Sequence, residues 1–228
     1  DPTSPSTSLG VAEATAAELE RRLESQHPIV VAMGSGRTLR AAVEQLPPME
    51  CPQHKIVSLV GNIAPDGSAS FYDVIIRIAD AVRAPHYPMP LPVIAATTHE
   101  KQLFLAQKSV ASVVDLARQA DVTFVGIGQI GDAAPLVQDG FVTPAEMGAL
   151  GKAGAVGEIV GWAFDARGNL IEGLTNDRVA SVPLDQPARR LIVGAAMGAF
   201  KAKAIKAALA GRLINGLITN ETNRKSVV

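Results

Sequence analysis

Residues 30–39, V-V-A-M-G-S-G-R-T-L, decide how the fold begins. An apolar and largely β-branched run ends abruptly in Gly-Ser-Gly, and apolar residues at helical spacing follow in R-T-L-R-A-A-V-E-Q-L. This pattern predicts a strand, a tight turn and a helix. Such a turn directs backbone N–H groups and the positive end of a helix dipole at one point, where an anion can bind. Glycines also occur in turns that hold no ligand. An anion-binding loop and a plain turn therefore both remain possible for Gly34, Ser35, Gly36, Arg37 and Thr38.

The composition excludes several classes of protein. The chain has 228 residues, of which 47% are hydrophobic and 19% are charged, and its formal net charge is -1. It lacks the strongly basic balance of a nucleic-acid-binding surface, and its apolar runs are too short to span a membrane. The single cysteine, Cys51, excludes an internal disulfide and fits a reducing compartment. We therefore expect a soluble cytoplasmic protein without a metal site.

The N-terminal residues, D-P-T-S-P-S-T-S, show neither an initiator Met nor a signal-peptide pattern. We expect them to be the cut end of a longer protein, whose missing part includes a partner domain. The chain itself is expected to form one domain over residues 1–228, with residues 1–28 as a linker and an amphipathic helix. That helix is predicted because Ala12, Ala16, Leu19 and Leu23 share one helical face.

Strand and helix patterns alternate along most of the chain. Strands are predicted at residues 29–33, 55–60, 121–126, 190–195 and 214–219, and helices at 38–45, 71–82, 99–107, 110–119, 200–209 and from residue 220. Gly61-Asn62 is predicted as a turn, and the proline-rich residues 84–93 as an irregular crossing that ends in an extended piece. Alternating strands and helices favour an α/β fold, with a mostly parallel sheet and helices on both faces.

Two further patterns interrupt this alternation. Thr143 is predicted to cap a short helix that begins at Pro144. Residues 155–173 are predicted to form a small β-hairpin insertion, with its turn at residues 165–168, D-A-R-G.

Ligands in an open parallel sheet bind outside the carboxyl ends of the strands, near a switch in strand order. The loops that follow the predicted strands supply small and polar residues, and one of them leads to Lys201. A cation in the first turn of a helix is locally unfavourable, which suggests a role in holding an anion, although a solvated surface lysine remains the alternative. Glu158 lies in the otherwise small and apolar G-A-V-G-E-I-V-G, where it either accepts hydrogen bonds from sugar hydroxyls or simply points outward.

Other chemistries find no support in the sequence. The four histidines show no metal-ligand spacing. The Gly-Ser-Gly stretch matches neither the G-x-S-x-G nucleophile elbow nor the G-x-x-x-x-G-K-[ST] and G-x-G-x-x-G nucleotide loops. We therefore expect no cofactor.

Four motifs, in order, resemble the C-terminal effector-binding domain of SorC-family bacterial transcriptional regulators, which respond to sugars. The motifs are V-A-M-G-S-G-R-T-L, A-D-V-T-F-V-G-I-G, G-A-V-G-E-I-V-G-W-A-F-D-A-R-G and K-A-K-A-I-K-A-A-L-A-G-R-L-I-N-G-L-I-T-N-E. The resemblance covers the chain from about residue 29 to its end. It implies a Rossmann-like fold related to the sugar-phosphate isomerases, which binds a phosphorylated sugar or polyol. It also implies a homodimer or homotetramer, and operator DNA bound only through an N-terminal helix-turn-helix that this chain lacks.

The resemblance also implies site residues. The loop from Gly34 to Thr38 would hold the ligand phosphate, and Glu158 and Lys201 would face the ligand. By the same analogy Tyr72, Asp73 and Gln129 would reach the sugar.

The chain departs from the family pattern at two places. Thr219-Asn220-Glu221 replaces the usual T-D-E, and Met197-Gly198 replaces a glycine pair. We therefore expect a ligand that differs from the commonest sugar phosphates, and the requirement for a phosphate stays open.

Two functions remain. The first is a ligand sensor, in which the metabolite shifts an oligomeric arrangement through unequal affinity for two states. The second is a sugar-phosphate isomerase, with Glu158 as general base and Lys201 holding phosphate or a substrate oxygen. An isomerase usually needs a second acid or base, and no His or Asp in a strand-end loop can be assigned to that role. The sequence therefore favours the sensor.

Overall fold

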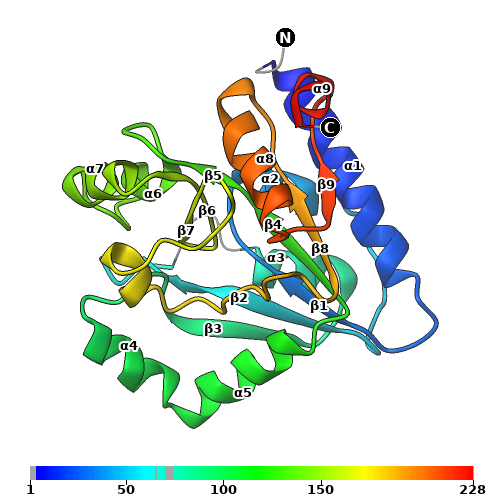
Figure 1. The fold of residues 1–228 in the computed structure, drawn as a ribbon. Coiled ribbons are helices and arrows are strands. Elements are labelled where there is room, and N and C mark those ends of the chain that lie inside the picture. Colours follow the sequence, from blue (N-terminus) through cyan, green and yellow to red (C-terminus); the bar gives the residue numbers. More distant parts are fainter. Residues whose placement is uncertain (1–3, 65, 70–73, 228) are drawn as a thin grey trace.

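A six-stranded sheet forms the centre of the structure, a computed structural model that describes residues 4–64, 66–69 and 74–227 (Figure 1). The strand order is β3-β2-β1-β4-β8-β9, and the strands pair in parallel. Their bounds are Val30–Met33 for β1, Lys55–Ile63 for β2, His86–Pro92 for β3, Val122–Gly126 for β4, Leu191–Ala195 for β8 and Gly216–Ile218 for β9. This confirms the predicted α/β fold with a mostly parallel sheet. The strand order switches direction between β1 and β4, the place where such sheets bind ligands.

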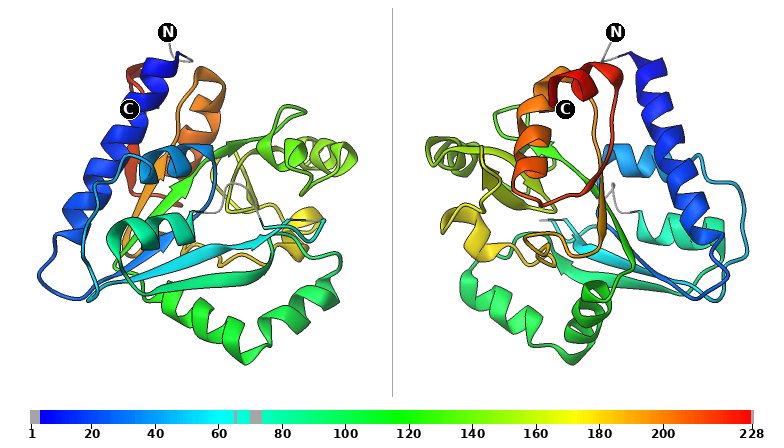
Figure 2. Two further views of the ribbon diagram at one scale, coloured as in Figure 1. Left: turned by 180° about the vertical axis from the view of Figure 1, so that it is seen from behind. Right: turned by 45° about the vertical axis from the view of Figure 1, so that its right-hand side comes forward.

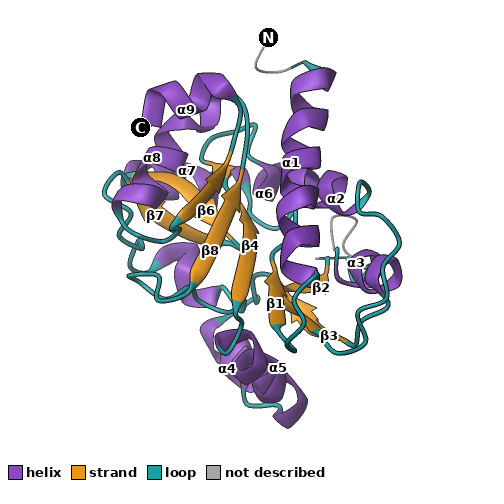
Figure 3. Ribbon diagram, turned by 90° about the vertical axis from the view of Figure 1, so that its right-hand side faces the viewer, coloured by secondary structure: helices purple, strands orange, loops and turns teal. Residues whose placement is uncertain are grey.

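Helices cover both faces of this sheet (Figures 2 and 3). Three of them share a hydrophobic cluster on one face: α1 (Pro5–Leu23), α2 (Arg37–Val43) and α3 (Ile75–Val82). The other face carries α4 (Thr98–Leu105), α5 (Lys108–Arg118) and α8 (Ala202–Ala210). Strand alternation explains the two layers, since Val31 and Met33 of β1 belong to the first cluster and Ala32 to the second.

A small antiparallel sheet, β5-β6-β7, extends from the carboxyl end of β4 (Figure 1). It consists of β5 (Gly128–Gln129), β6 (Ala155–Ile159) and β7 (Trp162–Asp165), and two helices lie between β5 and β6 in the chain, α6 (Pro135–Gln138) and α7 (Pro144–Lys152). The predicted cap of α7 is confirmed, because Thr143 and Glu146 form a reciprocal capping box.

The predicted hairpin turn at residues 165–168 is confirmed, but a tighter hairpin that precedes it was not predicted. Strands β6 and β7 are joined at Val160-Gly161, and both residues have positive φ, +47° and +89°. This backbone suits a two-residue hairpin loop, although valine rarely adopts it. The Asp-Gly signal forms the predicted turn after β7. Phe164 and Leu170 pair antiparallel on either side of it, and Asp165 accepts hydrogen bonds from the N–H groups of Arg167 and Asn169.

The prediction of a turn in the second strand was wrong, and that of the third strand was right only in its extended end. Gly61-Asn62 lies inside β2 rather than in a turn, because Gly61 lets β3 come close: a Cβ atom there would lie 2.0 Å from the Leu91 carbonyl oxygen. The proline-rich segment predicted as irregular forms β3. As an edge strand, β3 pairs only with β2, so prolines without an N–H group are tolerated.

The end of the chain differs from the prediction in detail. The predicted helix over residues 200–209 is divided into a short 3-10 turn, η2 (Ala199–Lys201), and α8, which ends at Gly211 as expected. A second 3-10 turn, η1 (Leu174–Arg178), and the C-terminal helix α9 (Glu221–Val227) complete the described elements. Among these helices none is long and apolar enough to cross a membrane.

Candidate functional site

A cavity of about 110 Å³ opens at the carboxyl ends of β1 and β4, at the switch in strand order. The loop after β1, the loop after β4, strand β6, the α6 segment and η2 all contribute to it. The charged residues that line it are Arg37, Asp139, Glu158 and Lys201, and the small or polar ones include Ser35, Gly36, Thr38, Gly126, Gly128 and Gly161. The structure therefore brings together six of the predicted residues: Ser35, Gly36, Arg37, Thr38, Glu158 and Lys201.

The loop after β1 forms one wall of the cavity. Gly34 lies beneath it, where its N–H group donates to the Phe124 carbonyl oxygen at 2.8 Å and a Cβ atom would lie 3.2 Å from Val160. Gly36, at φ +119°, precedes α2, and no described side chain caps this helix. Because α2 has only seven residues, its dipole is modest and most of the positive charge at the cavity comes from Arg37 and Lys201.

Glu158 enters the cavity from β6. Its carboxylate accepts a hydrogen bond from the Gly161 N–H group at 2.8 Å, within the tight hairpin turn. Burial raises the pKa of Glu158, while the Gly161 hydrogen bond and the positive charge of Lys201 act in the opposite direction. The outward-pointing alternative is thereby excluded, since the side chain lines the cavity. A carboxyl group in this position can accept hydrogen bonds from hydroxyl groups, or donate one while it is protonated.

Lys201 ends η2 and precedes α8. Its surroundings are crowded with protein atoms, and this desolvation lowers the pKa of its ammonium group; the carboxylate of Glu158 opposes the shift, and the positive charge of Arg37 adds to it. The alternative of a solvated surface lysine does not hold. Desolvation and the nearby Arg37 both disfavour the charged form of Lys201. A bound anion would offset both effects, so this arrangement favours anion binding.

Arg37 reaches across the cavity to the segment that contains α6. Its guanidinium group donates to the Asp139 carboxylate at 3.0 and 3.5 Å and to the Gln138 side-chain oxygen at 3.5 Å. Sequence analysis missed Asp139, because more than a hundred residues separate it from Arg37 and no local motif marks the contact. The ion pair joins the two sides of the cavity at its rim.

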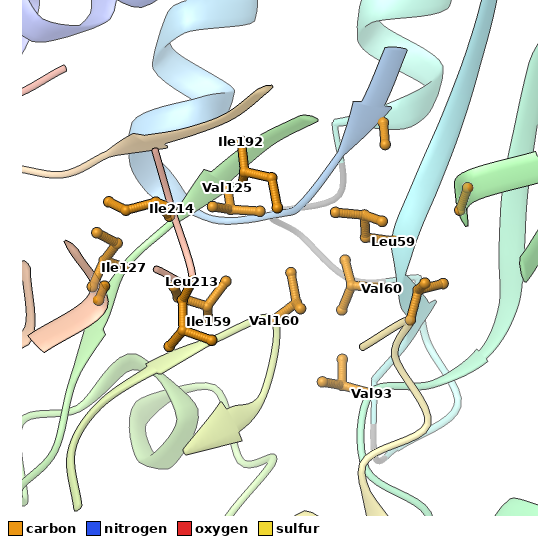
Figure 4. Packing of buried hydrophobic residues seen from close by; sticks show 14 of the residues in the cluster. Leu59, Val60, Val93, Val125, Ile127, Ile159, Val160, Ile192, Leu213 and Ile214 are labelled. Carbon is orange, nitrogen blue, oxygen red and sulfur yellow. The ribbon is translucent and has the colours of Figure 1, made fainter. Parts of the chain in front are cut away.

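The remaining lining is apolar. Val60, Val93 and Val160 come from three different segments and lie near one another (Figure 4), and Leu136 and Phe141 close the α6 side. These residues also escaped sequence analysis, because apolar residues of this kind usually mark the core. Apolar walls beside a few charged groups suit a small carbohydrate, which presents C–H groups as well as hydroxyls.

Two predicted residues that the structure describes, Gly34 and Gln129, do not line the cavity. Gly34 lies beneath it, as noted above. Gln129 donates its side-chain amide to the Ala133 carbonyl oxygen at 3.1 Å, and its own amide oxygen is buried without a hydrogen-bond partner among the described residues. Tyr72 and Asp73 lie outside the described residues. Within the described ranges, no group of three His, Cys, Asp or Glu side chains could hold a metal ion.

Comparison with protein families gives one match over nearly the whole chain. Residues 2–228 match the family described as "Putative sugar-binding domain". The erythritol catabolism regulatory protein EryD of Brucella abortus is 33% identical over 220 residues, which cover 96% of this chain and 70% of that protein. The transcriptional regulator LsrR of Klebsiella pneumoniae is 33% identical over 204 residues, which cover 87% of this chain and 61% of that protein. The chain thus spans about two thirds of the length of these relatives.

Solved structures share the fold. A DeoR-family transcriptional regulator from Listeria monocytogenes gives a TM-score of 0.87 at 18% identity, over 97% of this chain and 87% of that one. The full-length sorbitol operon regulator SorC from Klebsiella pneumoniae gives a TM-score of 0.84 at 24% identity, over 97% of this chain and 73% of that one. These identities establish the fold alone, while the family match and the two sequence relatives establish the kinship. The chain belongs to the sugar-binding domain family of SorC/DeoR-type transcriptional regulators.

Proposed function

We propose that the cavity binds a small phosphorylated sugar or polyol and that this binding is the signal that the regulator senses. The observation that carries the proposal is the pair of Lys201 and Glu158 at the switch in strand order. Both ionisable groups line one cavity, and burial shifts the pKa of each. In a structural role the two groups would be expected to neutralise each other or to be replaced by apolar residues. Ionisable groups whose pKa is shifted by burial in a cavity are candidates for binding a ligand.

The cavity lining contains different groups for the phosphate of the ligand and for its hydroxyl-bearing carbon chain. Lys201 and Arg37 provide positive charge for a phosphate, together with the loop of Ser35, Gly36 and Thr38. Glu158 provides an acceptor for hydroxyl groups. The apolar walls contact the carbon chain of the ligand. The erythritol named for the Brucella relative makes a four-carbon polyol, or its phosphate, the first compound to examine.

The regulatory part of the proposal follows from the relatives. They are transcriptional regulators that are longer than this chain, so we infer that a DNA-binding domain precedes it in the whole protein. Ligand binding would change the arrangement of a homodimer or homotetramer in the cytoplasm and so alter the affinity for operator DNA. The ligand would be released unchanged. The isomerase alternative finds no support in the relatives, and the second acid of the cavity, Asp139, is engaged by Arg37.

A thermal-shift screen tests this proposal. The domain is screened against erythritol, erythritol phosphate, other sugar phosphates, unphosphorylated sugars and inorganic phosphate, alongside a Gly36→Asp variant that places a negative charge in the loop. A ligand present at a hundredfold excess over its Kd adds about 2.7 kcal/mol to the free energy of unfolding. We expect phosphorylated compounds to stabilise the wild type and not the variant. Stabilisation by unphosphorylated compounds alone would contradict the phosphate part, and analysis of recovered compounds by NMR would reveal any turnover.

A further inference from the structure

The loop between β8 and η2 is held by side chains from the C-terminal segment. The N–H group of Gly198 donates to the Asn220 side-chain oxygen at 3.2 Å, and its carbonyl oxygen accepts a hydrogen bond from the Asn223 amide at 3.0 Å. Two residues earlier, the Ala196 carbonyl oxygen accepts a hydrogen bond from the Thr219 hydroxyl at 2.6 Å. Both polar groups of the Gly198 backbone are therefore fixed by asparagine side chains.

The same carbonyl oxygen also fixes Lys201. The Lys201 N–H group donates to the Gly198 carbonyl oxygen at 2.9 Å, which closes the η2 turn. Gly198 has φ +100°, a value that side-chain-bearing residues rarely adopt. Glycine adopts this conformation easily but does not enforce it, so the hydrogen bonds hold the loop in this shape. One oxygen atom thus links the Asn223 amide to the backbone of the residue whose ammonium group lines the cavity.

Packing alone does not explain Asn223. Its side chain is 0% exposed on a helix whose other residues are mostly exposed, and its amide oxygen has no hydrogen-bond partner among the described residues. A buried polar group with half its capacity unused is destabilising compared with an apolar residue of similar size. The part of the side chain that is used is the donor that contacts Gly198. Its position is therefore explained by that contact rather than by burial.

We propose that Asn223 and Asn220 are positioning residues for Lys201: through Gly198 they determine where its ammonium group stands in the cavity. The inference deepens the proposed function, on which the role of Lys201 rests, but the placement of Lys201 can be tested without any ligand. Helix α9 packs beside η2 and α8 (Figures 1 and 2). The C-terminal segment thus shapes the binding site through Gly198, although none of its described residues lines the cavity.

The test measures the titration of Lys201 itself. Lysines are converted to their ¹³C-dimethyl forms and followed by NMR as pH is raised, with Lys201→Arg identifying the signal of interest and the exposed Lys203 as internal reference. The variant Asn223→Ala removes the donor to the Gly198 carbonyl oxygen and adds no charge that could itself shift the titration of Lys201. We expect Lys201 to titrate at a higher pH in this variant than in the wild type, because a loosened turn lets water reach its ammonium group.

A matched control, Asn215, lies directly before β9. Asn215 bonds to the backbone of Ile192 and Arg190, at the end of β8 away from Lys201, with distances of 2.8 Å. Asn215→Ala should lower the melting temperature without moving the Lys201 titration. Asn220→Ala removes the other contact to Gly198 and takes the place of Asn223→Ala if that variant does not fold. The proposal is overturned if these variants lower the melting temperature while Lys201 titrates as in the wild type.

Discussion

Glu158 and Gly128 are directly paired across β5 and β6, and the carboxylate of Glu158 passes over Gly128 so closely that a Cβ atom there would lie 1.9 Å from Oε1. Only glycine leaves this space free. The obstructing atoms belong to the far part of a flexible side chain, so an added methyl group would move Glu158 rather than the backbone.

The substitution Gly128→Ala should therefore displace the Glu158 carboxylate from the cavity. Ligand affinity should fall about tenfold, the equivalent of one hydrogen bond of roughly 1.4 kcal/mol, while the domain remains folded. Calorimetric titration with the compound selected by the thermal-shift screen measures the change, and Glu158→Gln provides the comparison. Unchanged affinity in Gly128→Ala would show that the position of Glu158 is irrelevant to binding.

The raised pKa of Glu158 predicts how stability depends on pH. The folded protein holds this proton more tightly than the unfolded chain, whose carboxyl group titrates near its ordinary value of 4.5. The free energy of unfolding should therefore decrease as pH rises from the ordinary pKa through the raised one. Glu158→Gln removes this slope. Urea unfolding of both proteins at a series of pH values measures it, and parallel curves over this range would contradict the assignment.

The ion pair between Arg37 and Asp139 predicts competition at the rim of the cavity. Asp139→Asn removes a negative charge that an incoming phosphate must face and that holds Arg37. Affinity for inorganic phosphate should increase about 1.5- to 5-fold, which corresponds to the 0.2–1 kcal/mol of a partly exposed pair. The melting temperature should change little. Weaker phosphate binding in this variant would mean that Asp139 positions Arg37 for the ligand instead of competing with it.

Two glycines predict opposite effects on stability. A Cβ atom at Gly61 would collide with backbone atoms of Leu91 and Pro92, so Gly61→Ala should lower the melting temperature. At Gly10, in the exposed part of α1, nothing lies within 4 Å of the added carbon. Gly10→Ala should therefore stabilise the domain by about 0.5–1 kcal/mol. Calorimetric melting of both variants measures the two changes in stability. A stabilised Gly61→Ala variant would contradict the close approach of β2 and β3.

The sequence was sufficient for the fold class because strand and helix periods alternate clearly and each strand ends in small residues. It failed where tertiary context overrides local preference. Val160 adopts a positive φ in the loop that joins β6 and β7, and valine carries no signal for such a turn, whereas the Asp-Gly turn that follows β7 was predicted. The prolines of β3 are tolerated because that strand lies at the edge of the sheet.

The candidate site was predictable to the extent that its residues follow strands. The loop after β1 and Lys201 could be placed at the carboxyl edge of the sheet by topology alone, and Glu158 was singled out as a charge in an apolar strand. Asp139, Phe141 and the asparagines that hold Gly198 act through contacts distant in the sequence, which no local pattern encodes.

The central claim is that the ammonium group of Lys201 binds the anionic part of a small phosphorylated ligand. Calorimetric titration of erythritol phosphate, or of the phosphorylated compound that stabilises the domain most, into the wild type and Lys201→Met tests it most directly. The loss of a charged hydrogen bond of about 1.5–3 kcal/mol predicts binding weakened by roughly 10- to 150-fold. Lys203→Met, at an exposed position two residues away, should bind as the wild type does. Equal affinity in the wild type and Lys201→Met would contradict the account.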